Sequence, residues 1–473
     1  MPATLIDKDR RAANRAFVGE LGAHFDDFGI YPVETAALDA VEPSIADLRR
    51  ARRRREDVQG VGYMSLVEAD GVLRWELGAG PAPSRRGGPR RWARDTPAPG
   101  QTLRVLRQYK FADLPPNEVG AKLQQLDERL TRTQGLFQVV GGAPPRVGRR
   151  EAKPVEKGRI LLFVHGTFSH CDNLLAEIAA TPDGRRLLDV ALAGGRYAQV
   201  LAFNHPTLSV SPLLNAAELA RRFRDSRAEV DVICHSRGGL VARWWLEALD
   251  HAAAPRGTVV FAGAPLAGTS LAAPPRLRAA LNLLTNLSRA LRLAAQTTGR
   301  VFPAALPIGE AAGVLFGLFG KLTALAAKTP IVDAGVAMIP GLAGQSREGA
   351  NRELLELRGA FDGSGAGGRA RRAAERYAFL TSNFEPEDPA WRFWRYFRKD
   401  QMLNTAADLV FDGPNDLVVD TASMTGLADS FVPAGIPPDR IERFGDASAV
   451  VHHLNYFQQP ETIRFITRSL GLA

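Results

Sequence analysis

The stretch VDVICHSRGGLVAR, residues 230–243, decides the fold that we expect for this chain. Its first half holds Val230, Val232 and Ile233 in a short β-branched run, which is typical of a buried central strand. In its second half the apolar residues recur at helical spacing. Ser236 therefore falls on a sharp turn between a strand and a helix, where N–H groups at the helix start can stabilise negative charge.

The residues beside Ser236 fit a turn that exposes a nucleophile. Such a turn needs small neighbours, and Gly238 provides one on the helix side. Cys234 stands where the pattern G-x-S-x-G has its first glycine, and we interpret it as a variant because cysteine is also small. A plain strand–loop–helix connection is the alternative, since a serine followed by Gly-Gly also arises by chance in a chain with 45 glycines.

Strand-like apolar runs alternate with helical segments over the C-terminal part of the chain. Runs similar to residues 230–235 end in polar or glycine-rich turns, namely ILLFV at 160–164, AQVLAF at 198–203 and TVVFAGAP at 258–265. The run YAFLT at 377–381 resumes the pattern. This alternation predicts an α/β fold with a parallel sheet, in which ligands bind at the carboxyl ends of the strands.

Residues 271–374 interrupt this alternation. A leucine stripe at helical spacing is followed by the apolar run VLFGLF at 314–319 and by the Gly/Pro-rich residues 339–344. We interpret the insertion as a helical cap over the strand ends, and hypothesise that it is a mobile apolar lid that favours acyl substrates and contacts lipid surfaces. The alternative is that these helices merely extend the core. The stripe consists of Leu277, Leu281, Leu284, Leu287, Leu291 and Leu293.

Residues 1–150 are expected to form a small α+β accessory region, and residues 151–473 the main domain. A hairpin is predicted where Asp70 and Gly71 separate two apolar runs, because Asp-Gly accepts the positive φ of a two-residue turn. A strand over residues 102–111 and a helix follow. This region carries no obvious catalytic cluster, so its role is left open.

The net charge of +9 comes mostly from arginine, which is concentrated in runs at 49–55 and 85–94. Such runs could meet nucleic acid or an anionic membrane surface. No nucleic-acid-binding motif accompanies them, so we predict no nucleic-acid partner and interpret arginine as the ordinary surface cation of this chain.

The chain is expected to be cytoplasmic. It has only two cysteines, Cys171 and Cys234, and a disulfide framework is not predicted. Its first residues lack the apolar segment of a secretory signal. The most apolar stretch, residues 311–327, is interrupted by Lys321 and is short for a membrane span, which needs about 20 apolar residues.

A serine becomes a nucleophile at neutral pH when a histidine takes its proton and a carboxylate holds that histidine. Ser236, Asp416 and His453 follow one another in the order expected for an α/β-hydrolase. Here the chain resembles the lipase-like branch of that superfamily, over residues 159–472. The resemblance is carried by HG at 165–166, HSRGG at 235–239, ND-x-V at 415–418 and HL at 453–454.

The resemblance implies an α/β-hydrolase fold in which Ser236 is the nucleophile, Asp416 the acid and His453 the general base. The backbone N–H groups of Thr167 and Arg237 would form the oxyanion hole. The implied reaction is the cleavage of a carboxylic ester, from a small-molecule or lipid-like substrate, through an acyl-enzyme. No cofactor is implied. No set of calcium ligands matches that of the calcium-binding lipases, so no metal site is predicted.

Other assignments of the same roles stay open. His452 is the alternative base, because adjacent residues cannot be separated without geometry. Asp412 or Asp420 is the alternative acid. Cys234 is a further candidate nucleophile, although it lies in the strand end rather than at the turn.

The remaining histidines receive no catalytic role. We expect His165 and His235 to shape the turns, and His170 and His205 to line the entrance or lie at the surface. Within enzymes, a thioesterase, an amidase or an acyltransferase would use the same machinery. A non-catalytic hydrolase-like binding module, with the basic N-terminal region contacting a partner, is the alternative from another class.

Overall fold

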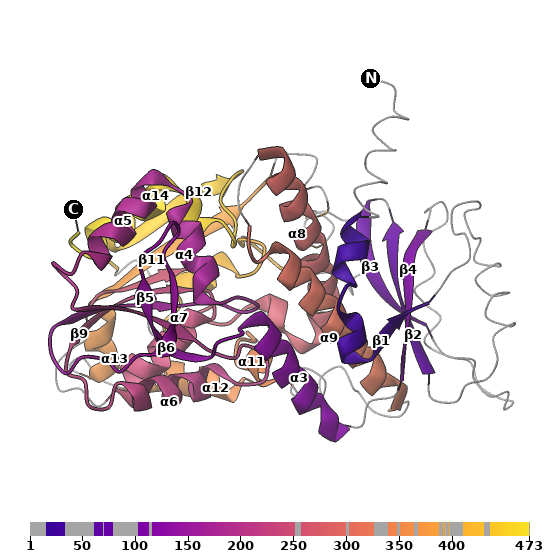
Figure 1. Cartoon of the computed structure of the whole chain (residues 1–473), viewed down its shortest axis with the longest axis horizontal. Helices are drawn as coiled ribbons and strands as arrows, with labels where there is room; N and C mark the ends of the chain where they lie inside the picture. Colours follow the sequence, from indigo (N-terminus) through magenta and orange to yellow (C-terminus); the bar gives the residue numbers. More distant parts are fainter. Residues whose placement is uncertain are drawn as a thin grey trace, which may run out of the picture. The chain divides into compact units, whose positions relative to one another are not determined.

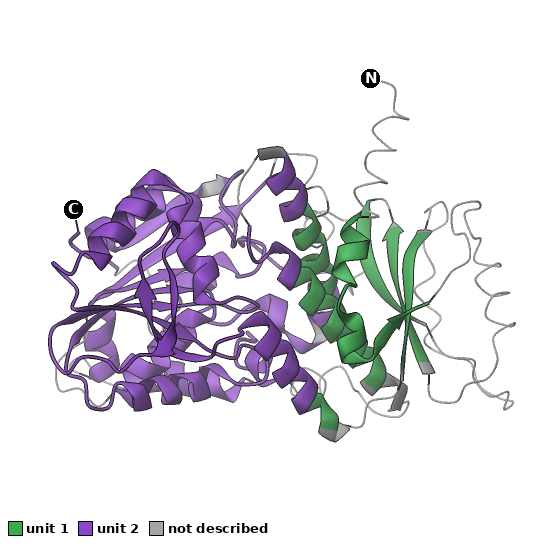
Figure 2. Ribbon diagram, in the orientation of Figure 1, with its two compact units in different colours: residues 1–119, 281–290, 308–331 green, residues 120–280, 291–307, 332–473 purple. Residues whose placement is uncertain are grey.

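The chain forms two compact units, distinguished by colour in Figure 2. One unit comprises Met1–Val119, Leu281–Ala290 and Ile308–Ile331, and the other comprises Gly120–Ala280, Leu291–Pro307 and Val332–Ala473. The computed structural model describes residues 16–33, 61–69, 71–78, 103–112, 116–250, 257–298, 302–325, 339–347, 351–363, 368–386, 391, 393, 397, 410–429 and 436–472.

The larger unit is built on an eight-stranded mixed sheet (Figure 1). Its strands from β7 onward are parallel, whereas β5 runs antiparallel to both of its neighbours, β8 and β6. The order across the sheet is β12-β11-β10-β9-β7-β8-β5-β6. The strands are β5 (Gly135–Val140), β6 (Arg146–Glu151), β7 (Arg159–Val164), β8 (Gln199–Asn204), β9 (Glu229–His235), β10 (Val259–Ala262), β11 (Tyr377–Phe384) and β12 (Ile441–Ser448).

Helices cover both faces of this sheet (Figure 1). Side chains alternate along each strand, so Ile160, Leu162 and Val164 of β7 enter one buried cluster while Leu161 and Phe163 enter the other. The first cluster includes residues of α6, α7, α12 and α13, and the second includes residues of α4, α5 and α14; these helices are α4 (Cys171–Ala179), α5 (Pro182–Leu192), α6 (Pro212–Arg222), α7 (Gly238–Arg243), α12 (Arg352–Gly363), α13 (Arg369–Ala374) and α14 (Pro460–Ser469). The predicted α/β class is therefore confirmed.

Shorter elements complete the larger unit. A π-helical turn over Trp244–Leu249 continues α7, and α11 (Pro340–Ala343) lies within the insertion over residues 271–374. Helix α3 (Pro116–Leu130) precedes β5. The 3-10 turns are Ser270–Ala272, Pro274–Arg276, Thr421–Thr425, Pro438–Arg440 and Tyr456–Gln458.

The smaller unit contains an antiparallel sheet of order β1-β4-β2-β3. The predicted hairpin is confirmed, because Ala69 pairs with Val72 and Gly71 has a φ of 83°. The predicted strand over residues 102–111 is confirmed as β4. The elements are a 3-10 turn at Phe25–Phe28, β1 (Ile30–Pro32), β2 (Val61–Ala69), β3 (Val72–Gly78) and β4 (Leu103–Ala112).

The middle of helix α8 (Leu277–Thr298) covers the edge strand β3 within the smaller unit. The side-chain oxygen of Asn286 accepts a hydrogen bond from Leu73 N over 2.9 Å, and its amide nitrogen donates to Leu73 O over 2.7 Å. Asn282 accepts from Trp75 N over 2.8 Å. These side chains pair the backbone groups that an edge strand leaves open.

Helix α9 (Ala305–Leu325) presents glycines to the same unit. A Cβ atom at Gly313 would come within 2.4 Å of the Phe25 ring, and one at Gly317 within 2.4 Å of Ile30 Cδ1. The missing side chains therefore allow aromatic and aliphatic groups of the N-terminal segment to lie directly against the helix backbone.

This arrangement differs from the expected domain organisation in two places. Strands β5 and β6 join the eight-stranded sheet, so the larger unit begins at Gly120 rather than after residue 150. The insertion over residues 271–374 is not one separate cap, because Leu281–Ala290 and Ile308–Ile331 belong to the unit of the N-terminal sheet. Over the described residues, no helix combines the length and the apolar character required to cross a bilayer.

Candidate active site

Ser236 lies on the turn between β9, which ends at His235, and α7, which begins at Gly238. Its φ of 53° is in the left-handed region, which is uncommon for a residue with a side chain. Ser236 N donates a hydrogen bond to the backbone oxygen of Ala262 at the end of β10, over 2.9 Å. The predicted strand–turn–helix arrangement is confirmed, and the turn holds a strained backbone of the kind found at functional sites.

Glycine is required both in this turn and in the segment after β7 that lies against it. A Cβ atom at Gly238 would lie 2.6 Å from the backbone oxygen of Val164, and one at Gly166 would lie 2.7 Å from Ser236 Cβ. Cys234 faces elsewhere, because its thiol donates to the backbone oxygen of Val260 over 3.3 Å. Burial raises the pKa of this thiol well above its usual value, which makes Cys234 unsuited to act as the nucleophile.

Asp416 and His453 form a buried hydrogen-bonded pair. Nδ1 of His453 is 2.8 Å from Oδ2 of Asp416, and the backbone N–H of His453 donates to the backbone oxygen of Asp416 over 3.0 Å. The side-chain contact assigns the proton to Nδ1 when the imidazole is neutral, which leaves Nε2 able to accept a proton. The pair therefore has the geometry of a carboxylate that orients a general base.

The Asp416 carboxylate is held by further donors. Its Oδ1 accepts from the backbone N–H groups of Val418 over 3.1 Å and Val419 over 2.8 Å. The hydroxyl of Tyr456 donates to Oδ2 over 3.0 Å. Burial, and then the charge of Asp416, raise the pKa of Tyr456 well above its usual value, so this hydroxyl keeps its proton.

The pair lies at the same edge of the sheet as Ser236. The His235 ring is 4.7 Å from the His453 ring between centroids, and its Nε2 donates to the backbone oxygen of His453 over 2.8 Å. A Cβ atom at Gly263, directly after Ala262, would lie 3.0 Å from Asp416 Oδ2 and 3.2 Å from His453 Nδ1. The structure thus brings the three predicted residues to the carboxyl ends of β9 and β10.

The segment after β7 supplies the other predicted oxyanion residue. Thr167 follows Gly166, which lies against Ser236, and its hydroxyl donates to Oε1 of Gln345 over 3.2 Å. His165 shapes this turn, because its Nδ1 donates to Gly166 O over 2.8 Å while its Nε2 accepts from His205 N over 3.0 Å. Burial lowers the pKa of His165 to about 3, so this ring stays neutral.

A family described as a domain of unknown function, DUF7379, matches residues 129–471. The chain belongs to this family. No curated protein matches the chain.

Among solved structures, bacterial lipases resemble the DUF7379 chain. The mature form of a lipase from Bacillus licheniformis is similar over 68% of this chain and 96% of its own, with 13% identity and a TM-score of 0.32. Its propeptide form matches 71% of this chain and 53% of its own, with 13% identity and a TM-score of 0.33. Lipase 1 from Pelosinus fermentans matches 67% of this chain and 98% of its own, with 12% identity and a TM-score of 0.38.

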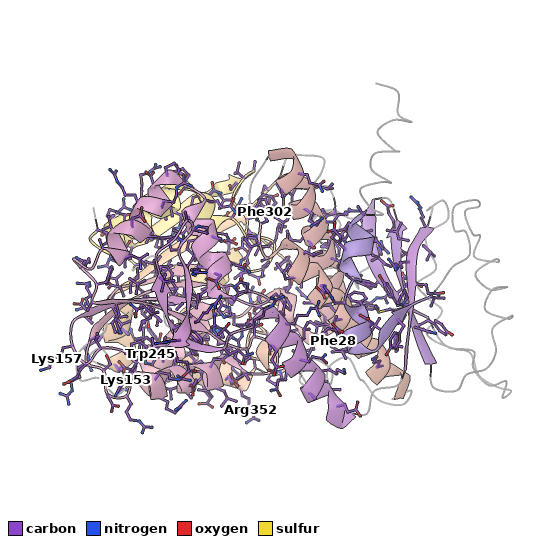
Figure 3. All side chains as sticks on the ribbon, in the orientation of Figure 1. Phe28, Lys153, Lys157, Trp245, Phe302 and Arg352 are labelled. Atoms are coloured by element: carbon purple, nitrogen blue, oxygen red, sulfur yellow. The ribbon has the colours of Figure 1, made fainter. Side chains whose placement is uncertain are left out.

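His452, the alternative base, points into an aromatic cluster in the DUF7379 chain. Its ring centroid is 5.1 Å from that of Trp391, 5.4 Å from that of Phe384 and 6.0 Å from that of Phe302, which Figure 3 labels. Its Nδ1 accepts from the backbone N–H of Leu454 over 3.2 Å. His452 therefore packs among these aromatic rings, whereas the contact with the Asp416 carboxylate is made by His453.

The alternative acids are engaged in other contacts. Asp412 pairs with Arg276 over 2.7 Å and is half-exposed. Asp420 accepts from the backbone N–H of Ser270 over 2.9 Å and pairs with Arg347 over 3.2 Å. These contacts brace loops, whereas Asp416 alone among the three meets a histidine in the described part of the chain.

The other histidines differ in exposure. His205 was expected at the entrance or the surface, but it is buried and stacks on His165 with ring centroids 4.2 Å apart, because the turns after β7 and β8 lie side by side. His170 is partly exposed and lies 3.7 Å from Asp172. Across the described residues, no group of three or more His, Cys, Asp or Glu side chains is arranged to hold a metal ion.

Two residues that support the site lie outside the motifs of the sequence. Tyr456 bonds to Asp416 from 40 residues away, and Asp127 bonds to the turn after β8 from 80 residues away. A tyrosine three residues after His453 is a local pattern that could have been noticed. Asp127 stands on a helix face without any neighbouring motif.

Proposed function

We propose that this DUF7379 protein is a serine hydrolase of the α/β-hydrolase type that cleaves carboxylic esters. The observation that carries the proposal is the 2.8 Å contact between His453 and Asp416 beside the left-handed turn of Ser236. A nucleophile on a strained strand-to-helix turn, with a carboxylate–histidine pair at the same sheet edge, is the arrangement used for acyl transfer.

In the proposed reaction, Ser236 Oγ attacks the ester carbonyl carbon while its proton passes to Nε2 of His453. The negative charge that develops on the carbonyl oxygen meets the backbone N–H groups of Arg237 and Thr167. His453 then returns the proton to the leaving alcohol as the carbon–oxygen bond breaks, which leaves an acyl-enzyme. Water activated by His453 releases the acid and restores Ser236. Asp416 remains a carboxylate and stabilises the imidazolium.

The substrate class follows from the surroundings of the base. Phe302 and Trp391 are only partly buried and lie around His452, directly beside His453 in sequence. An apolar wall of this kind suits an ester of an apolar acid, either a small molecule or a lipid. A thioester or an amide substrate, or an alcohol acceptor in place of water, would use the same residues in the same roles.

The test is labelling with a fluorophosphonate probe and turnover of p-nitrophenyl esters. Wild type should react with both, and Ser236→Ala should lose both. Cys234→Ala is the matched control, since it removes the neighbouring nucleophilic atom and should keep both activities. Absence of labelling and turnover in folded wild-type protein would reject the enzyme and favour a non-catalytic binding module.

A further inference from the structure

A single buried carboxylate accepts hydrogen bonds from several groups of the loop that follows β8. Asp127 of α3 is fully buried and accepts hydrogen bonds from the backbone N–H groups of Thr207 over 2.7 Å, Leu208 over 3.0 Å and Ser209 over 2.7 Å. It also accepts from the hydroxyls of Thr207 over 3.2 Å and Ser209 over 2.6 Å. Three consecutive backbone donors fix the course of this loop more tightly than ordinary turn bonds do, because hydrogen bonds to a carboxylate are the stronger kind.

The Thr207 hydroxyl links this carboxylate to the segment of Thr167. Its oxygen donates to Asp127 and accepts from the backbone N–H of Phe168 over 3.4 Å. Phe168 has a φ of 58°, so the residue directly after Thr167 holds a left-handed conformation that a phenylalanine rarely adopts. Such a backbone persists only where its surroundings impose it, and the Thr207 hydroxyl is one of the groups in contact with it.

Arg237 holds the other end of the same loop. Its guanidinium is fully buried and donates through Nη2 to the backbone oxygen of Val210 over 2.5 Å. Within the described residues its Nε and Nη1 have no hydrogen-bond partner. Burying a cation with unpaired donors costs stability, so the position of this side chain needs another explanation. Burial lowers the pKa of Arg237 to about 10, and the negative charges of Asp127 and Glu353 oppose this shift and favour the charged guanidinium.

We propose that Asp127 is a positioning residue for the oxyanion hole, acting with Arg237 to clamp residues 205–210 so that Phe168 keeps its left-handed turn and the Thr167 N–H faces the reacting carbonyl. This inference rests on the proposed function of Ser236. Asp127 lies just before the segment that matches the family, residues 129–471, and on a helix that the sequence assigns to the accessory region.

The experiment compares two inhibitors of Ser236. A trifluoromethyl ketone forms a tetrahedral adduct whose oxyanion needs the hole, whereas the parent methyl ketone serves as a ligand that resembles the ground state. Asp127→Asn should weaken the trifluoromethyl ketone and lower kcat by about ten- to a hundredfold, while KM and methyl ketone affinity stay within about twofold. Glu128→Gln, the exposed neighbour on α3, is the matched control and should change neither.

A second variant keeps the proposal testable if Asp127→Asn does not fold. Thr207→Val removes the acceptor of the Phe168 N–H and one hydroxyl donor to Asp127, while the carboxylate and its three backbone donors remain. It should weaken the trifluoromethyl ketone several-fold, and Thr207→Ser should restore the affinity. Equal weakening of both ketones, or no weakening in any variant, would overturn the positioning role. Wild type that binds neither ketone covalently nor the fluorophosphonate would instead reject the proposed function itself.

Discussion

Two buried polar networks, one in each unit, serve different ends. In the smaller unit, Asn282 and Asn286 of α8 bond to the backbone of the edge strand β3. In the larger unit, Asp416 collects donors so that His453 is held by Nδ1 and keeps its Nε2 available. The first network satisfies groups that folding would otherwise leave unpaired, and the second, in the function that we propose, orients one nitrogen to accept a proton.

Backbone strain separates the two networks as well. The larger unit has non-glycine residues with positive φ at Phe168, Ser236 and Leu417, each within one residue of a candidate site residue. In the described part of the smaller unit, positive φ occurs only at glycines, Gly29 and Gly71. The comparison teaches that a buried polar network is not by itself the signature of an active site. Backbone strain and a histidine nitrogen that can accept a proton distinguish the candidate site from the structural network.

The largest expected effect is the loss of kcat when the network of Asp416 and His453 is broken and the network of Asn282 and Asn286 is left intact. His453→Ala should lower kcat for p-nitrophenyl esters by at least about 10³-fold, because His453 is the histidine that the Asp416 carboxylate orients to take the Ser236 proton in the proposed reaction. His452→Ala should lose far less, since that ring packs among aromatic side chains. Steady-state kinetics on both variants checks this, and the reverse ranking would assign the base to His452.

The second prediction concerns a variant that breaks only the network of Asn282 and Asn286 in the smaller unit. Asn286→Ala should lower the free energy of unfolding by about 1–3 kcal/mol for each Leu73 backbone group left unpaired. At temperatures where the protein stays folded, kcat should not change. Denaturant unfolding provides the measurement, with Ser288→Ala as control: that buried hydroxyl on the same helix has no partner among the described residues, so its loss should cost little. A change in kcat with unaltered stability would contradict this division.

The third prediction, a smaller loss of kcat, tests how much the hydrogen-bond donors around Asp416 contribute. Tyr456→Phe removes one hydrogen bond to Oδ2 and should lower kcat about five- to tenfold, which corresponds to about 1–1.4 kcal/mol. Tyr197→Phe is the matched control, because its hydroxyl bonds to Asp231, which lies in the middle of β9 and away from its carboxyl end. Equal losses of kcat in the two variants would contradict a specific contribution of the Tyr456 hydrogen bond to Asp416.

The last prediction concerns kinetics least, because it involves a buried acid that belongs to neither network. Burial raises the pKa of Glu177 on α4 from 4.5 to about 8. Between these values the unfolded chain has released this proton and the folded chain retains it, so native stability falls as pH rises through this window. Glu177→Gln should therefore gain in Tm relative to wild type from pH 5 to pH 8. The exposed Glu461→Gln should show no such trend, and parallel Tm curves for all three proteins would refute the prediction.

The sequence predicted the Ser236 turn because the strand and the helix on either side of it are encoded by neighbouring residues. Val230 to Ile233 encode the strand, and Gly238 encodes the start of the helix. Asp416 and His453 came from the resemblance to lipase-like hydrolases, and the contact between them is a property of the fold. Asp127 could not be predicted, since its partners lie 80 to 82 residues away and no spacing rule connects a helix to a distant loop.

The leucine stripe of residues 277–293 illustrates a different limit. It correctly indicated a helix with a buried face, and Leu284 and Leu287 are buried. An apolar stripe does not show which element the helix packs against. The middle of this helix belongs to the unit of the N-terminal sheet rather than to a cap. Asn282 and Asn286, one turn apart on the same helix, were the informative residues, because buried amides at that spacing need backbone partners.

The hydrogen bond between the Trp75 N–H and Asn282 can form only late in the synthesis of the chain. The two residues are 207 positions apart, so at about 5–20 residues per second a ribosome needs roughly 10–40 s to make the helix that covers β3. During that interval the open edge of the hairpin is available to any other unpaired strand, including one on a neighbouring nascent chain. We expect the yield of native protein to depend on whether the edge stays unoccupied until α8 leaves the ribosome.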